Sequence, residues 1–200
     1  MQKIKPTKLA TLIAPLIATL FLLLAGCSSQ RPMATVDYVD IERFMGDWYV
    51  IANIPTFLEK GAHNPVESYQ LEADGTIATT FTFNADSFDG EQKIYHPRGF
   101  IKNTQTNAEW GMQFLWPIKA DYRIVYLDAE YQYTVIGRNN RDYVWIMARS
   151  PVITAQKYTE LANFVATLGY NPQLLEKAPH QIAGAIKQPH VLKALKVIKE

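Results

Sequence analysis

Apolar and polar positions alternate along short segments between Asp47 and Arg149, and turn-forming residues interrupt these segments at intervals of roughly 8–12 residues. This pattern is typical of antiparallel β structure. It predicts strands at residues 47–54, 66–72, 76–83, 91–101, 108–116, 121–127, 131–137 and 142–149. Consecutive hairpins with no long crossover indicate an up-and-down meander, which can remove its exposed edges by closing into an eight-stranded antiparallel β-barrel. A two-sheet sandwich is the alternative.

Two other segments complete the predicted all-β fold. The long loop at residues 58–67 is expected to be a lid at the barrel mouth. After the eighth strand, Thr154 can cap a helix that runs to about Leu168 with its apolar residues on one face, so we expect this C-terminal helix to pack outside the barrel. Residues 176–186 show no clear strand pattern.

The first residues have the layout of a secretory signal, because Lys3, Lys5 and Lys8 precede an apolar run at residues 9–24. This run is shorter than the roughly 20 residues that a spanning helix needs. It ends at Leu24-Ala25-Gly26-Cys27, which resembles the lipobox of bacterial lipoproteins.

That resemblance implies that residues 1–26 are removed as a lipoprotein signal peptide and that Cys27 carries the lipid anchor at the head of a linker, residues 27–35. Ser28, where an aspartate would resemble an inner-membrane retention signal, favours the outer membrane, with the periplasmic face expected. An uncleaved signal anchor with an incidental cysteine is the alternative.

The remaining composition narrows the chemistry. Cys27 is the single cysteine, so disulfides and cysteine metal sites are excluded, and the four histidines are scattered. The sequence has no Gly-x-Ser-x-Gly elbow, and we expect neither an enzyme, nor a metal, nor a cofactor. Without its three signal lysines the formal charge falls from +1 to −2, so nucleic acid is not an expected partner. Residues 179–200 form a basic amphipathic tail, suited to an anionic membrane or to a solvated terminus.

Three features in order along the chain resemble the lipocalin family, and in particular bacterial outer-membrane lipoproteins that resemble apolipoprotein D. They are Gly46 and Trp48 at the first strand, Asp128 and Tyr131 in the turn before the seventh strand, and Arg149 at the end of the eighth strand. The resemblance implies a barrel plus helix at residues 36–178. It also implies that Trp48 plugs the closed end with the Arg149 guanidinium over its indole.

Side chains alternate inward and outward along barrel strands, so residue parity predicts the lining of the interior. The predicted lining residues are Val50, Ala52, Phe81, Phe83, Met112, Phe114, Trp116, Tyr122, Ile124 and Tyr133. Such a wall suits a long apolar chain, and a filled core is the alternative. Four cationic residues near strand ends are candidates to bind the carboxylate of a fatty acid, namely Arg98, Lys102, Lys119 and Arg123.

Together these features favour a membrane-anchored protein that binds long-chain fatty acids, such as palmitate, or lysophospholipids for lipid storage, transport or envelope maintenance. Two alternatives stay open: a filled barrel that acts as an envelope interaction module, and an enzyme on an apolar substrate. The sequence does not decide between a monomer and a homodimer.

Overall fold

The computed structural model describes residues 32–181, and the described residues from Met33 onward belong to one compact unit. The predicted signal peptide, Cys27 and most of the basic tail lie outside the described residues. Among the residues described, no helix is both long enough and apolar enough to cross a membrane.

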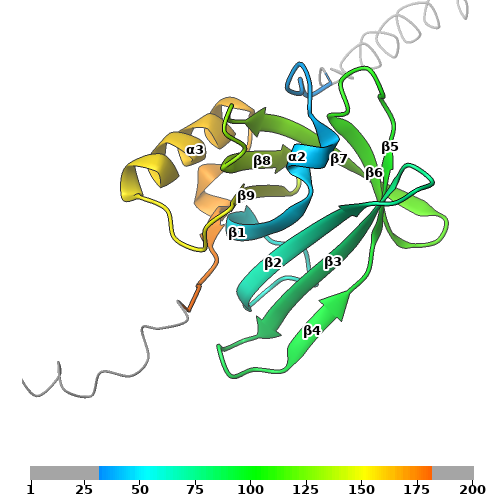
Figure 1. Ribbon diagram of the computed structural model, residues 1–200. Helices are drawn as coiled ribbons and strands as arrows, with labels where there is room; N and C mark the ends of the chain where they lie inside the picture. Colours follow the sequence, from blue (N-terminus) through cyan, green and yellow to red (C-terminus); the bar gives the residue numbers. More distant parts are fainter. Residues whose placement is uncertain (1–31, 182–200) are drawn as a thin grey trace, which may run out of the picture. The chain divides into compact units, whose positions relative to one another are not determined.

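Ten strands and three short helical segments make up the described part of this unit (Figure 1). The strands are β1 (Gly46–Ile54), β2 (Ala62–Leu71), β3 (Thr76–Ala85), β4 (Gln92–Tyr95), β5 (Arg98–Ile101), β6 (Glu109–Leu115), β7 (Ile118–Leu127), β8 (Tyr133–Gly137), β9 (Val144–Ala148) and β10 (Glu176–Lys177). The helices are α2 (Ile41–Phe44), α3 (Ala155–Thr167) and the 3-10 helix η1 (Pro172–Leu174).

The sheet closes into the predicted antiparallel barrel. Its strand order is β1-β2-β3-β5-β6-β7-β8-β9, and β9 pairs back with β1. Two strands lie outside this ring of eight, because β4 pairs with β3 and β10 pairs with β1. The barrel prediction is therefore confirmed, and the sandwich is wrong.

Three element boundaries differ from the prediction. The expected strand at 91–101 is two strands, because Pro97 has no N–H to donate to a ladder. β2 begins at Ala62, so the connecting loop is residues 55–61 instead of 58–67, and a register shift between His63 and Val66 accommodates the proline between them. The two residues of β10 are too few to produce an alternating pattern.

The helix α3 covers the outside of the barrel beside β8 and β9, as Figure 1 shows. Thr154 caps it as predicted, with its Oγ1 accepting a hydrogen bond from the Lys157 N–H at 3.1 Å. Leu161 and Val165 are fully buried against outward-facing residues of the barrel wall such as Ile146. Burial of each such side chain contributes about 1.5–3 kcal/mol, so this face fixes the helix on the wall.

The closed end of the barrel is filled by aromatic rings. Trp48, Trp110 and Phe44 are completely buried, and Tyr69 packs among them. The Arg149 guanidinium lies 3.9 Å from the Trp48 ring, in the arrangement that the resemblance implied. It donates hydrogen bonds of 2.7–3.1 Å to the carbonyls of residues 43, 44, 45 and 47.

The other residues shared with the family pattern meet at the same end. Gly46 has φ +89°, which favours glycine, and a Cβ there would lie 3.5 Å from an Arg149 nitrogen. The Asp128 carboxylate accepts backbone N–H bonds in the turn between β7 and β8, including that of Gln132 at 2.8 Å. The Tyr131 hydroxyl accepts from the Asp40 N–H at 2.9 Å. These residues tie the segment before β1 to the barrel floor.

We expect replacement of Arg149 by methionine to lower the free energy of unfolding by about 2–4 kcal/mol, because four carbonyl groups lose a charged donor. Urea unfolding measures the effect. A matched change, Arg98→Met, removes a cation whose single ion pair, with Asp74, is exposed, and should cost under about 1 kcal/mol. Equal losses in both variants would contradict the role assigned to Arg149.

Candidate functional site: an apolar cavity at the open end of the barrel

Above the aromatic plug the barrel interior is hollow. A cavity of about 470 Å³ opens at the end where β1, β3, β6 and β8 finish. Its volume lies in the range of roughly 300–1,000 Å³ typical of small-molecule sites. Its lining comprises Thr56, Phe57, Leu58, Glu59, Glu67, Phe81, Tyr95, Pro97, Met112, Phe114, Leu115, Ala120, Asp121, Tyr122, Arg138, Tyr143 and Trp145. The filled-core alternative therefore describes only the closed end.

Strand alternation builds the wall of the cavity. Met112 lies opposite Ala120 in the β6–β7 ladder, and both line the cavity because residues directly opposite share a face. On β3 the Phe81 ring stacks with that of Tyr95, with centroids 6.4 Å apart. The β1–β2 loop, residues 55–61, forms one side of the mouth. It overlaps the loop at residues 58–67 that was predicted to be a lid.

Of the ten predicted lining residues, Phe81, Met112, Phe114 and Tyr122 line this cavity. Three more face the interior without lining it. Val50 borders a smaller neighbouring cavity of about 90 Å³, Phe83 packs beside Phe81, and Ile124 is buried in the closed-end cluster.

The other three predictions were wrong. A register shift between Val50 and Ala52 reverses the parity of β1, so Ala52 belongs to the outer cluster under α3. A similar shift between Ile124 and Tyr126 changes the pairing of β7 with β8, and Tyr133 faces outward below the Lys157 ammonium. Trp116 lies in the β6–β7 turn and is 81% exposed.

A polar group lies at the base of the cavity wall. The Tyr69 hydroxyl donates to the Glu67 carboxylate and lies 2.8 Å from the Tyr122 hydroxyl. Glu67 is opposite Phe81 in the ladder and so faces inward, where its accessible surface belongs to the cavity. Burial without a cation raises the pKa of Glu67 to about 7, and the charge of Glu59 adds to the shift while the Tyr69 bond opposes it.

A second carboxyl group lies at the mouth. Burial raises the pKa of Glu59, opposed by hydrogen bonds from the Thr56 N–H and the Trp145 indole N–H, both at 2.9 Å. Glu59 therefore holds the β1–β2 loop against β9. Sequence inspection missed both carboxyls: Glu59 lay in the predicted loop at 58–67, and Glu67, although inside the predicted strand at 66–72, was not assigned to the lining.

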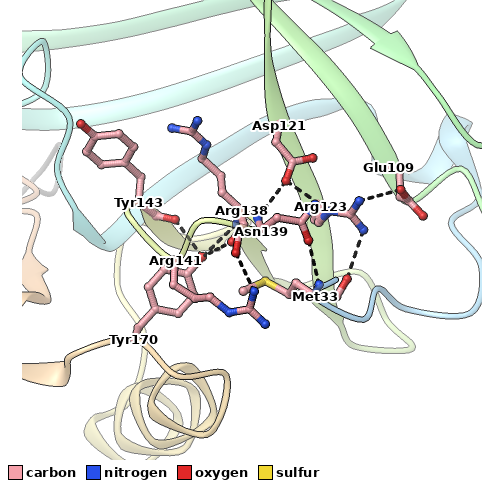
Figure 2. A network of polar contacts seen from close by, with 9 residues as sticks. All are labelled: Met33, Glu109, Asp121, Arg123, Arg138, Asn139, Arg141, Tyr143 and Tyr170. Carbon is pink, nitrogen blue, oxygen red and sulfur yellow. Dashed lines mark hydrogen bonds and ion pairs between the residues drawn. The ribbon is translucent and has the colours of Figure 1, made fainter. Parts of the chain in front are cut away.

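One cation, Arg138 in the β8–β9 loop, lines the cavity. Its guanidinium lies 3.3 Å from Asp142 and its buried Nε has no hydrogen-bond partner among the described residues. The cations proposed from sequence lie elsewhere: Arg123 is paired with Glu109 and Asp121, and Lys119 lies over the Phe100 ring (Figure 2 shows the Arg123 pairs). Arg98 pairs with Asp74, and Lys102 is not part of the lining.

Within residues 32–181, no group of three or more His, Cys, Asp or Glu side chains is placed to hold a metal ion. The ionisable groups of the cavity are instead dispersed around an apolar wall.

Residues 39–180 match a family model described as a lipocalin-like domain. The chain is 29% identical over 167 residues to temperature-induced lipocalin-1 of Arabidopsis thaliana, which covers 76% of this chain and 85% of that relative. It is 27% identical over 165 residues to the outer membrane lipoprotein Blc of Escherichia coli K12, covering 80% of this chain and 92% of that protein.

The fold is also similar to the solved structure of insecticyanin from the tobacco hornworm Manduca sexta. The TM-score is 0.59 at 14% identity, and the match covers 74% of this chain and 85% of insecticyanin. At that identity the likeness supports the barrel architecture alone.

Proposed function

Because the chain belongs to the lipocalin family, we propose that its open cavity binds the acyl chain of a long-chain fatty acid or lysophospholipid. The observation that carries this proposal is the hollow, largely apolar upper half of the barrel above a solid floor. Burial of a sixteen-carbon chain gives a gross gain of ~10 kcal/mol at ~0.8 kcal/mol per methylene, before association and ordering costs. Micromolar affinity is therefore reachable through apolar contact.

The acidic or phosphate end of such a ligand lies at Arg138 in this proposal. The unpartnered Nε and the position of this residue at the mouth support that orientation. Glu67 favours the same orientation, because an anionic head group placed deep in the cavity would meet this carboxyl group.

The cell envelope is the proposed place of action. The relative from E. coli is named an outer membrane lipoprotein, and the sequence around Cys27 resembles a lipobox. We therefore propose lipid attachment at Cys27, on the periplasmic face of the outer membrane, and a role in lipid storage, transport or envelope maintenance. The function is binding, not catalysis.

Protein beginning at Ser28, delipidated and titrated with a fluorescent C16 fatty acid, tests the proposal. We expect saturable one-to-one binding that lysophospholipid displaces. Arg138→Met should weaken fatty-acid binding about tenfold, since a charge-assisted hydrogen bond contributes about 1.5 kcal/mol or more, and should leave the C16 alcohol unaffected. Lys119→Met is the matched control, because the Lys119 ammonium lies over the Phe100 ring and is not part of the cavity lining. Failure to bind any of these lipids would refute the proposal.

A further inference from the structure

Five large apolar side chains surround the mouth of the cavity and are unusually exposed. They come from the β1–β2 loop and from the β6–β7 hairpin, and we call them the mouth rim: Phe57 (80% exposed), Phe114 (52%), Leu115 (71%), Trp116 (81%) and Ile118 (67%). Leu115 and Ile118 pair directly across the hairpin. Contiguous apolar surface of this kind marks an interaction site.

The mouth rim is continuous with the cavity. Phe57, Phe114 and Leu115 line the cavity as well as being exposed to solvent, so apolar surface extends without interruption from the interior to the outside. A partner bound at the rim therefore also contacts any ligand that enters or leaves.

The charge of the rim segments fits an anionic lipid surface. The hairpin sequence from Gly111 to Ala120 contains Lys119 and no acidic residue, and the β1–β2 loop, residues 55–61, contains Lys60 and the buried Glu59. Tryptophan and phenylalanine are the side chains that lie best at the boundary between head groups and acyl chains.

The described chain begins beside the open end. Figure 2 shows Met33 bonded through its N–H to the Asn139 side chain at 2.7 Å and through its carbonyl to Arg123 at 3.1 Å. Asn139 follows Arg138 in the β8–β9 loop, which contributes to the cavity lining. Met33 is the sixth residue after Cys27, and six residue steps of fully extended chain span at most about 20 Å.

We infer that the mouth rim docks into the head-group layer of an anionic membrane, with the cavity mouth facing the bilayer. The inference rests on the proposed function for the anchor at Cys27, which brings this end of the barrel to the membrane. Rim docking lets an acyl chain pass between bilayer and cavity while remaining in contact with apolar surface.

Quenching of tryptophan fluorescence by brominated lipid tests the inference, because Trp116 is the exposed indole. Trp48 and Trp110 are fully buried, and Trp145 is held inside by its bond to Glu59. The full lipidated chain is reconstituted in phosphatidylethanolamine–phosphatidylglycerol vesicles with brominated acyl chains. We expect strong quenching, most of which is lost in Trp116→Phe and in Leu115→Glu.

The matched control places an exposed tryptophan at the other end of the barrel. In the Trp116→Phe background, Val152→Trp puts an indole at a position after β9 where the native side chain is 53% exposed. This indole should not be quenched. Equal quenching of both positions, or no quenching at Trp116, would overturn docking. Burial of Trp116 in contacts between copies of the protein, instead of in lipid, would also overturn it.

Flotation of the same vesicles separates the two proposals. Protein that floats with the vesicles but shows no Trp116 quenching retains its anchor and refutes rim docking. Protein that does not float refutes the anchor, and with it the inference that depends on it. Ligand titration, performed without vesicles, reports on the cavity alone.

Discussion

Replacement of Ala120 by tryptophan is expected to reduce affinity for a C16 fatty acid about 100-fold or more while the barrel stays folded. Ala120 faces the hollow part of the interior opposite Met112, so the added indole occupies space that the acyl chain needs. Exclusion of about four methylenes at ~0.8 kcal/mol each accounts for a loss of this size. Titration with a fluorescent fatty acid measures it, and circular dichroism checks the fold.

The matched control uses the same substitution on the outside of the wall. Ala78 lies on β3 between the buried residues Ile77 and Thr79, so its side chain faces outward. Ala78→Trp should bind like the wild type. If Ala120→Trp binds normally, or if both variants lose binding equally, the acyl chain does not occupy this cavity.

The second large effect is a loss of stability with rising pH that depends on Glu67. An acid with a pKa of 4.5 when unfolded and about 7 when folded binds its proton more tightly in the folded state. Its contribution is fully present below pH 4.5 and is lost as the pH rises to about 7 and beyond. At ~1.4 kcal/mol per pH unit, the free energy of unfolding falls by about 3 kcal/mol across this window.

Glu67→Gln keeps an acceptor for the Tyr69 hydroxyl and removes the ionisation. Urea unfolding at pH 5 and pH 8 should show most of the fall in the wild type and a smaller fall in the variant. The remaining dependence has the same sign, because the pKa of Glu59 is raised as well. An unchanged slope in Glu67→Gln would show that Glu67 is not buried as a neutral acid.

A ligand in the cavity covers Glu67 further, which favours its neutral form. Affinity for an apolar ligand should therefore also decline as the pH rises through about 7, and less so in Glu67→Gln. The same carboxyl group links the stability of the empty barrel to its capacity for lipid.

The barrel was predictable because the sequence signals for its strands and turns lie within short segments of the chain. Turn residues and alternation along each strand indicated eight strands, and Thr154 marked the helix that begins after it. The resemblance carried by Gly46, Trp48 and Arg149 added the closed end, where the geometry around the indole agrees with what the family pattern implied.

The lining was only partly predictable, because parity holds only while the register does. The shifts in β1 and in the β7–β8 ladder send Ala52 and Tyr133 to the outer face, and no local sequence signal marks them. Arg138 lies in a loop, where alternation gives no direction. Glu67 lies within the predicted strand at 66–72, and its inward direction follows from its pairing across the ladder with Phe81, which the sequence alone does not give.

A crystal of the protein with a long-chain fatty acid brominated near the middle of its chain tests the central claim most directly. We predict one anomalous bromine peak inside the cavity, between Phe81, Met112 and Tyr122, with the carboxylate toward Arg138. A bromine peak outside the barrel wall, or between two copies with the cavity empty, would contradict the proposed function.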